Sequence, residues 1–246
     1  MNKCSTKFNK INTAVILAGG LGTRLRSLIS EIPKPMALIN GKPFLEILLN
    51  YWIKQGVGKF FLSVGYKYEI IQNFFGNYFN GVEIEYVIER EPLGTGGGLL
   101  KALDLFSLNN PVLILNGDTF FKIDLKKFEN FHFSNNSSWT FALFKTNEEN
   151  RYKAISTNEY GKVIEFKKNT LSGNLFSANG GVYIIEPNII KKMDFIREKK
   201  MSLEDEILPR VFEKVENLFA YEFDENFIDI GVPKDYLLAP NIINYK

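Results

Sequence analysis

The sequence predicts an α/β fold in which a mostly parallel, mixed sheet is flanked by helices and is followed by a β-richer second half. The first half alternates short apolar runs with helical patterns, as a sheet covered on both faces requires. From about residue 138 the strand patterns follow one another directly. The 246 residues are 45% hydrophobic and 14% aromatic, which is ample for a large core and excludes general disorder.

Short apolar runs predict three strands of the first half, and alternation of apolar and polar residues over 82–88 predicts a fourth, half-buried one. Apolar residues at helical spacing predict its helices. The expected strands are Ala14–Ala18, Phe60–Val64, Val82–Ile88 and Val112–Leu115. The expected helices are Phe44–Gln55, a stretch carrying Ile70, Ile71, Phe74 and Phe75, and Gly94–Leu105.

The second half predicts four strands followed by two helices. The expected strands are Trp139–Lys145, Tyr152–Ser156, Val163–Lys167 and Val182–Ile185, and the helices are Asn188–Lys199 and the stretch after Ser202. No internal repeat or linker interrupts the chain. We therefore expect a loose N-terminal lead-in over residues 1–12 and a single domain over residues 13–240, with halves at 13–135 and 136–240.

The charge distribution argues against a dedicated binder of duplex nucleic acid. The net charge is +2, although the first 60 residues carry nine basic and two acidic side chains. A nucleic-acid binder needs a dominant basic face. The local excess predicts instead an anion site near the N-terminus.

Cysteine, histidine and hydropathy exclude further classes of protein. The single cysteine, Cys4, excludes a disulfide framework and a cysteine-built zinc site and fits a reducing compartment. The single histidine, His132, lies between two phenylalanines and is better read as a packed or surface residue than as a catalytic one. No apolar run approaches the roughly 18 residues of a membrane span. We expect a cytoplasmic chain that binds neither nucleic acid nor membrane.

A glycine-rich loop follows the first strand, where Leu17 and Ala18 lead into Gly19, Gly20, Gly22 and Thr23. Glycines let backbone N–H groups approach a phosphate chain closely. A dinucleotide fingerprint would need a third glycine where Leu25 stands, and no Walker-type loop occurs. Taken alone, the glycines fit a structural turn equally well.

Basic residues beside the loop favour phosphate binding. Of six arginines in the chain, Arg24 and Arg26 stand on this loop, and the guanidinium fork matches phosphate oxygens. Lys34 lies between Pro33 and Pro35, which hold it in a stiff, extended segment. By itself Lys34 would fit a surface lysine in a proline turn; together with the loop it predicts an anion contact.

Two aspartates are candidates for a metal site. Asp118 follows a buried strand and is expected at the carboxyl edge of the sheet, and Asp229 lies between two isoleucines before Gly231. Two carboxylates that converge suit Mg²⁺, which takes oxygen ligands and shares phosphate oxygens. Each aspartate alone would also fit a capping or turn residue.

These motifs together resemble the signature of the sugar-phosphate nucleotidyltransferases. The resemblance is carried by Gly19–Leu25 with Pro33–Met36, and it continues through Glu91–Gly97, Asn116–Asp118, Asn179–Tyr183, Ser202–Glu204 and Ile228–Gly231 to Tyr236. It covers essentially residues 13–240. It implies a Rossmann-like fold and an enzyme that joins a nucleoside triphosphate to a sugar 1-phosphate and releases pyrophosphate.

The resemblance also implies roles for individual residues, with the nucleotide bound by the first half and the sugar by the second. The implied nucleotide-binding residues are Leu17, Gly19, Gly20, Gly22, Thr23, Arg24, Glu89, Gly94 and Thr95. The implied sugar-binding residues are Asn179, Gly180, Glu204 and Lys168. Arg24, Lys34 and Asp118 are implied as catalytic, with Asp118 and Asp229 holding Mg²⁺.

Glu89 favours guanine, because one carboxylate can accept hydrogen bonds from the adjacent N1–H and amine of that base. An exposed acid ending a strand is the alternative reading. Within the family the likeness implies GTP and D-glycero-α-D-manno-heptose 1-phosphate as substrates, for the synthesis of bacterial surface polysaccharide such as capsule or S-layer glycan. Uridylyl, cytidylyl and mannose-1-phosphate guanylyl transfer remain alternatives.

One segment departs from the family pattern. Many relatives carry Phe-x-Glu-Lys-Pro, with the acid and the lysine near the sugar phosphate, whereas this chain has Phe166, Lys167, Lys168, Asn169 and Thr170. Lys168 thus replaces the acid and Asn169 the lysine. Lys167 or Lys168 is expected to supply the positive charge.

Two other classes of protein compete with the enzyme reading. A nucleotide-sugar glycosyltransferase would show a short Asp-x-Asp motif, but Gly117–Phe120 carries one aspartate. A non-catalytic nucleotide-sugar-binding regulatory subunit should have lost Arg24, Lys34, Asp118 or Asp229, and all four are present. The sequence leaves open whether the chain forms a homodimer.

Overall fold

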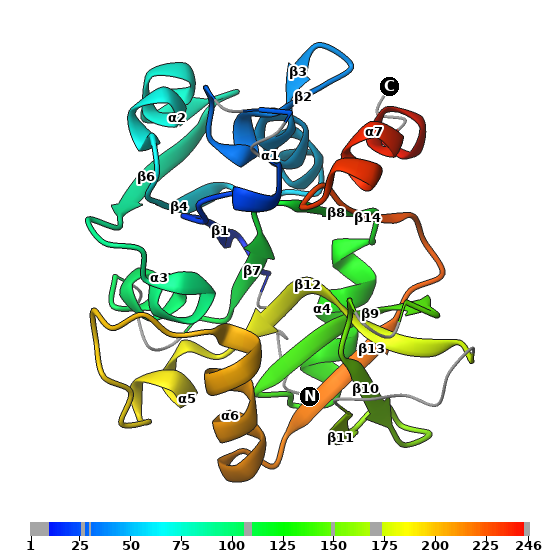
Figure 1. Ribbon diagram of the computed structural model, residues 1–246. Coiled ribbons are helices and arrows are strands. Elements are labelled where there is room, and N and C mark those ends of the chain that lie inside the picture. The colour runs from blue at the N-terminus through cyan, green and yellow to red at the C-terminus, as the bar shows by residue number, and fades with distance from the viewer. Residues whose placement is uncertain are drawn as a thin grey trace, which may run out of the picture.

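The structure, a computed structural model, describes residues 10–25, 28–29, 31–105, 110–148, 151–167 and 174–243, the side chain of Lys167 excepted. A central sheet runs through the molecule and helices cover both of its faces (Figure 1). Cys4, Arg26 and Lys168 lie outside the described residues.

Fourteen strands were assigned in the described part of the chain. They are β1 (Thr13–Ala18), β2 (Leu38–Ile39), β3 (Lys42–Pro43), β4 (Lys59–Val64), β5 (Tyr78–Phe79), β6 (Val82–Ile88), β7 (Val112–Asn116), β8 (Thr119–Phe121), β9 (Trp139–Thr146), β10 (Ala154–Thr157), β11 (Val163–Lys167), β12 (Phe176–Ile185), β13 (Leu218–Glu222) and β14 (Phe227–Asp229).

Seven α-helices accompany them within the described residues. They are α1 (Phe44–Lys54), α2 (Tyr68–Phe75), α3 (Gly94–Leu103), α4 (Leu125–Ser134), α5 (Pro187–Lys191), α6 (Leu208–Lys214) and α7 (Pro233–Ile242). Short 3-10 turns lie at Thr23–Leu25 and Lys34–Met36, and a π-helical turn at Leu203–Ile207 leads into α6.

The sheet is mixed, with a parallel centre. Its order is β11-β10-β12-β7-β1-β4-β6-β5, with β9 pairing β12 and β13 pairing β9. Strand β1 lies between β4 and β7 and is parallel to both, whereas β12 is antiparallel to β7 and β9. The expected mixed, mostly parallel architecture flanked by helices is confirmed.

Alternation along β1 explains why helices cover both faces. Ala14 and Ile16 belong to one apolar cluster, which also contains buried residues of α1, α2 and α4, and Val15 and Leu17 belong to another, which contains those of α3, α5 and α6. Each face therefore buries its own core, and the helices lie on opposite sides of the sheet (Figure 1).

Two expectations about elements are corrected. The helix expected at Asn188–Lys199 ends at Lys191, because Met193 and Phe195 bury alternate side chains along a non-helical segment. The strand expected from Val182 begins at Phe176, because the first half of β12 pairs with β9. The elements that were not anticipated are helices α4 and α7 and strands β2, β3, β5, β8, β13 and β14.

The chain is already held in place at residues 10–12, the end of the expected lead-in. Ile11 is fully buried and its N–H donates to Glu129 Oε1 at 2.8 Å. The carbonyl of Asn12 accepts hydrogen bonds from the N–H groups of Gly58 and Lys59.

The strand order places a ligand crevice beside β1. After β1 the chain adds β4 and β6 on one side and then crosses to form β7 on the other. Ligands of open α/β sheets bind at such a switch point, outside the carboxyl ends of the strands. In this molecule those ends are Leu17–Ala18 and Asn116, and both meet the candidate site.

Candidate active site

A cavity of about 510 Å³ opens at the carboxyl ends of β1 and β7. A smaller cavity of about 280 Å³ shares Leu17, Gly20 and Thr95 with it, and a third of about 1010 Å³ shares Gly19 and Glu89 with the smaller one. We name these the sugar-side, loop and outer cavities. Because they share lining residues, they form one crevice.

The glycine loop lines the loop cavity. Gly22 has φ of +59°, and a side chain there would meet Cβ of Lys34 at 3.0 Å, so the turn requires glycine. Gly20 faces open space, since no atom lies within 4 Å of where its Cβ would be. Eight of the nine expected nucleotide-binding residues line this cavity: Leu17, Gly19, Gly20, Gly22, Thr23, Glu89, Gly94 and Thr95. The ninth, Arg24, lines the sugar-side cavity.

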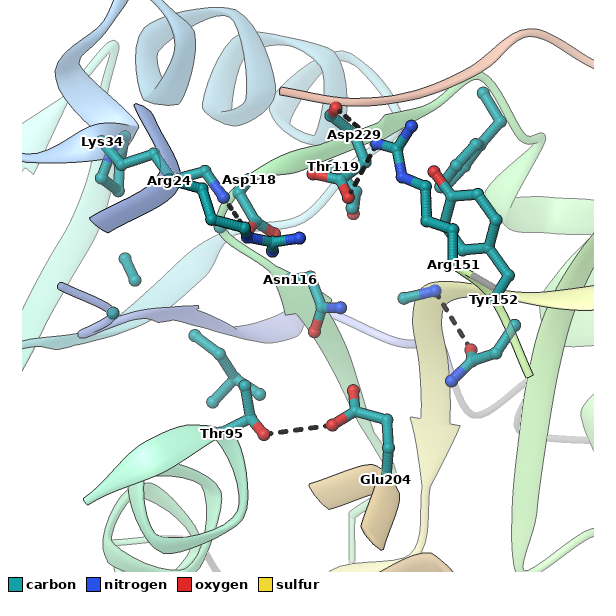
Figure 2. A pocket seen from close by; sticks show the side chains of 18 of the residues that line it. Arg24, Lys34, Thr95, Asn116, Asp118, Thr119, Arg151, Tyr152, Glu204 and Asp229 are labelled. Atoms are coloured by element: carbon teal, nitrogen blue, oxygen red, sulfur yellow. Dashed lines mark hydrogen bonds and ion pairs between the residues drawn. The ribbon is translucent and has the colours of Figure 1, made fainter. Parts of the chain in front are cut away.

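Lys34 reaches the sugar-side cavity from the 3-10 turn that follows Pro33. Its side chain is 9% exposed and its ammonium forms an ion pair with the carboxylate of Asp118. A Cβ placed on Gly231 would lie 2.8 Å from Lys34 Nζ and 3.3 Å from Arg24 Nη2. Arg24, Lys34 and Asp118 therefore converge, as Figure 2 shows.

The pairing of β14 with β8 brings Asp229 to Asp118 across more than a hundred residues. Asp229 is the register partner of Thr119, and the N–H of Ile230 donates to the carbonyl of Asp118 at 2.9 Å. Gly231 N–H donates to Asp229 Oδ1 at 2.6 Å. Burial and the neighbouring negative charge of Asp118 raise the pKa of Asp229.

This carboxylate pair fits a divalent cation. Asp118 and Asp229 both line the sugar-side cavity, and their charges repel each other, which a hard cation with oxygen ligands would relieve. Within the described residues no group of three or more His, Cys, Asp or Glu side chains is arranged to hold a metal ion by itself. The remaining ligands would have to come from phosphate oxygens and water.

Arg151, which sequence reasoning did not single out, holds Asp229 from the other side. Its Nη2 donates to the carbonyl and to Oδ2 of Asp229, both at 3.1 Å, and its Nη1 pairs with Asp235 and with Glu148. Although burial alone lowers the pKa of Arg151, its hydrogen bonds to Asp235 and Asp229 raise it above the ordinary value. Arg151 is thus bound to three carboxylates.

The sugar-side cavity is closed at its other end by polar groups from β12 and from the π-helical turn. Asn179 donates to the Tyr183 hydroxyl at 2.7 Å, and Glu204 accepts from Thr95 Oγ1 at 3.2 Å. Burial is the main cause of the raised pKa of Glu204, and the charges of Asp118 and Asp205 add to it. Figure 2 shows Glu204 and Thr95 across the cavity from Asp229.

The structure brings Gly181 rather than Gly180 to the cavity. A side chain at Gly180 would meet the Phe121 ring at 2.6 Å, so this glycine faces the core. Gly181, with φ of +69°, lines the sugar-side cavity beside Asn116. Lys168, the remaining expected sugar-binding residue, lies outside the described residues.

Three residues that line the sugar-side cavity each carry a buried, unpaired polar atom. Asn116 Oδ1, Thr119 Oγ1 and Arg151 Nε have no hydrogen-bond partner within the described part of the chain. Buried polar groups are nearly always paired in folded proteins. Because these atoms are also shielded from solvent, each leaves a hydrogen bond unsatisfied in this arrangement of the lining.

Glu89 is more enclosed than an exposed strand-end acid. It is 7% exposed, and its carboxylate accepts from Ser63 Oγ at 2.9 Å and from Leu93 N–H at 3.0 Å. It lines the loop and outer cavities, next to Gly19. Glu89 thereby ties the end of β6 to the start of α3.

Two further features lie apart from the site. His132 is 1% exposed in α4 and its Nδ1 lies 2.7 Å from Thr140 Oγ1, which confirms a packed residue. Among the described residues no helix is both long enough and apolar enough to cross a bilayer.

Known proteins are similar to this chain over nearly its whole length. The D-glycero-α-D-manno-heptose 1-phosphate guanylyltransferase of Campylobacter jejuni is 44% identical over 223 residues, which are 91% of this chain and 96% of that protein. The enzyme of the same name from Aneurinibacillus thermoaerophilus is 44% identical over 228 residues, 92% and 96% of the two chains. The crystal structure of HddC from Yersinia pseudotuberculosis complexed with GMP-PN matches with a TM-score of 0.79 and 34% identity, covering 94% of this chain and 99% of that one. The family model described as nucleotidyl transferase matches residues 13–244, and the chain belongs to that family.

Proposed function

We propose that this chain transfers GMP from GTP to D-glycero-α-D-manno-heptose 1-phosphate and releases pyrophosphate. The observation that carries the proposal is the convergence of Arg24, Lys34, Asp118 and Asp229 in one crevice at the switch point of the sheet. The names of the two relatives at 44% identity supply the sugar and the base.

The reaction needs no general base. A phosphate oxygen of the sugar 1-phosphate is already ionised near neutral pH, since the second phosphate pKa is about 6. That oxygen forms a bond to the α-phosphorus of GTP while the bond from the α-phosphorus to the bridging oxygen of the β-phosphate breaks. The electron pair leaves on pyrophosphate. The protein therefore has to align two polyanions and offset their repulsion.

Basic residues from the first half align the triphosphate and offset its charge. In our proposal Arg24 binds the β- and γ-phosphates that depart, and the loop glycines offer N–H groups to the same chain. Lys34 offsets charge at the α-phosphate, which lies at the point where Lys34 now contacts Asp118.

Asp118 and Asp229 would hold Mg²⁺. When bound, Mg²⁺ neutralises phosphate charge at the reacting centre. Arg151 keeps the Asp229 carboxylate oriented towards Asp118 through its paired contacts to that residue and to Asp235. Arg151 is thus a positioning residue in this proposal.

Glu89 is proposed to read guanine. Each of its carboxylate oxygens accepts one hydrogen bond within the protein, and a carboxylate oxygen can accept two. The N1–H and amine of guanine could use the remaining lone pairs in the loop and outer cavities. Glu89→Gln would turn one acceptor into a donor, so GTP should lose most of its preference over ATP and UTP. Unchanged selectivity would remove Glu89 from base recognition.

Asn179, Glu204 and Lys168 are proposed on the sugar side, with Gly180 shaping the bend that presents Gly181. Because GTP is made in the cytoplasm, we place the reaction there, and its product would serve surface polysaccharide synthesis.

The test is pyrophosphate release with Mg²⁺ across GTP, ATP, UTP and CTP and a panel of sugar 1-phosphates. We expect the highest kcat/KM for GTP with D-glycero-α-D-manno-heptose 1-phosphate, and mannose 1-phosphate is the matched six-carbon comparison. Release with no pair of substrates would refute the enzyme proposal. Preference for UTP or CTP would refute the assignment of the base.

A further inference from the structure

An ion pair bridges two walls of the sugar-side cavity. Lys153 immediately precedes β10, Asp205 lies in the π-helical turn, and both side chains line the cavity. The Lys153 ammonium contacts Asp205 Oδ1. The contact joins segments 52 residues apart and involves two residues to which sequence reasoning gave no role.

The Asp205 end of the pair lies away from the reacting centre, and Lys153 reaches it from the segment that carries Arg151 and Tyr152. Asp205 follows Glu204 directly, and Figure 2 shows Glu204 and Thr95 on the opposite side from Arg24, Lys34 and Asp229, with Asn116 between them. A Lys153 side chain that reaches Asp205 therefore ends near Glu204.

The phosphate end already has its cations. Of the described cationic side chains that line this cavity, Arg24 and Lys34 converge beside Gly231 and Arg151 is fixed to Asp229, Asp235 and Glu148. Lys153 is the fourth, and its ion-pair partner stands on the opposite wall. The charge of Lys153 is thus placed for the sugar rather than for the reacting phosphates.

The pair is open to exchange with a ligand. The side chains of Lys153 and Asp205 are 40% and 67% exposed, whereas those of Arg151 and Asp229 are 18% and 14% exposed. An exposed pair of this kind holds its geometry weakly, because solvent screens it. An ammonium can donate and a carboxylate can accept, so the two groups side by side match two neighbouring hydroxyls of a polyol.

We propose that Lys153 and Asp205 form a specificity pair that binds the exocyclic diol of a seven-carbon sugar. The inference rests on the proposed function. In a heptopyranose the ring ends at C5, and C6 and C7 extend beyond it with one hydroxyl each, whereas a hexopyranose has one exocyclic hydroxyl. With C1 and its phosphate held at the carboxylate end, the proposal turns the C5 side of the ring, and with it C6 and C7, towards the pair. The second hydroxyl then distinguishes the two sugars.

Steady-state kinetics on heptose 1-phosphate and mannose 1-phosphate test the pair. Lys153→Met keeps the apolar stem and removes the charge, and Asp205→Asn keeps the shape and removes the acceptor charge. Each variant should lower the ratio of kcat/KM for heptose 1-phosphate to that for mannose 1-phosphate by about tenfold, the loss expected for one hydrogen bond to a charged group. The KM for GTP should not change.

Lys145→Met is the matched control. Lys145 is also an exposed lysine, 52% exposed, paired with Glu222 at 3.0 Å, and it does not line the sugar-side cavity. The Lys145→Met variant should have the same ratio of kcat/KM for the two sugars as the wild type. Circular dichroism melting of all three variants checks that they are folded.

The outcomes separate the two proposals. If Lys153→Met weakens both sugars equally, the lysine acts on their shared phosphate and the specificity pair is refuted. An unchanged ratio in both variants of a wild type that uses heptose 1-phosphate also refutes the pair but leaves the proposed function standing. A wild type inactive on heptose 1-phosphate refutes the sugar assignment and the pair together.

Discussion

Lys34 and Asp118 are the two residues whose loss should remove most of the turnover. Lys34 is nearly buried against Asp118, and both face the crevice where the α-phosphate is proposed to lie. Removing a preorganised charge of this kind typically costs about 10²–10³ in kcat. We expect Lys34→Ala and Asp118→Asn each to fall in that range in a pyrophosphate-release assay.

The control for Lys34→Ala is Lys42→Ala. The Lys42 side chain is 64% exposed, and its ammonium lies 3.8 Å from Glu46 Oε1. Lys42 lies outside the crevice. This variant should keep wild-type kcat. If Lys34→Ala or Asp118→Asn also turned over at nearly the wild-type rate, the proposed mechanism would be wrong.

Glu204 should make the protein less stable as the pH rises. Burial raises the pKa of its carboxyl above the ordinary 4.5, so the folded state keeps a proton that the unfolded chain releases. Stability therefore falls from about pH 4.5 up to the folded pKa and stays lower above it. Glu204→Gln cannot ionise and should escape this loss.

The measurement is the thermal unfolding midpoint of Glu204→Gln and the wild type between pH 4 and pH 8 without ligands. The two midpoints should agree at the acid end and the variant should melt a few degrees higher at neutral pH. Glu213→Gln, at an exposed acid of α6, should follow the wild type. A variant less stable than the wild type at neutral pH would contradict the burial argument.

The sequence predicts site residues that belong to a local motif and misses those placed by distant pairing. Arg24 follows glycines that let the backbone approach a phosphate, and Lys34 lies between prolines that stiffen its segment. Both residues could therefore be singled out from the sequence. Arg151 and Lys153 carry no such local signal. Arg151 reaches Asp229 across 78 residues, where the neighbouring Tyr152 packs against Phe227. Lys153 reaches Asp205 across the cavity.

Among the elements, strands were the most predictable, and β6 and β11 have the expected bounds. The apolar runs at β1, β4 and β7 lie within one or two residues of the strands observed, because a strand buried on both faces must be apolar throughout. The first half of β12 was missed, because the polar Asn179 and the two glycines interrupt the apolar run although they lie within the strand, where its register shifts. The helix expected after Asn188 was extended too far, past Lys191. Met193 and Phe195 fit both a helical pattern and the non-helical segment that is observed.

Helix α3 depends on a glycine at its first residue. Gly94 has φ of +69°, and a side chain there would lie 2.7 Å from the carbonyl oxygen of Met201. Alanine would be strained in this conformation and would also push away the Leu93–Met201 contact, so Gly94→Ala should lose more than about 1 kcal/mol of unfolding free energy.

Gly20→Ala is the matched comparison for Gly94→Ala. Its added carbon meets no atom within 4 Å, yet it enters both the loop and sugar-side cavities. We expect wild-type stability in urea titrations and a raised KM for GTP. The reverse pattern, with Gly20→Ala unstable and Gly94→Ala unaffected, would overturn this account of the loop.

At the scale of the whole molecule, the two halves of the chain meet at the crevice. The first half supplies Arg24 and Lys34, and the second supplies Asp229 and Glu204, so neither half contains a complete site. The basic excess of the first 60 residues is thereby placed opposite acidic groups from later segments. A ligand that contacts both halves should therefore stabilise the entire fold.

GTP and Mg²⁺ together should raise the unfolding midpoint more than either alone. A ligand at 100 times its Kd adds about 2.7 kcal/mol to the free energy of unfolding. For a chain of this size each kcal/mol corresponds to about 2–4 °C, so the shift should be about 5–10 °C. Without the metal, the triphosphate would face the unrelieved charges of Asp118 and Asp229, and the shift should be smaller.

Asp229→Asn tests whether the metal contributes through the carboxylate pair. In this variant the shift with GTP and Mg²⁺ should fall to the value seen with GTP and EDTA, because one of the two carboxylates is gone while the loop and Arg24 remain. Its midpoint without ligands is measured beside the wild type, because the amide can keep only one of the two hydrogen bonds that the carboxylate oxygens accept from Gly231 and Arg151. A full Mg²⁺-dependent shift in Asp229→Asn would mean that the cation is bound elsewhere, and the role of Asp229 would then be to hold Arg151.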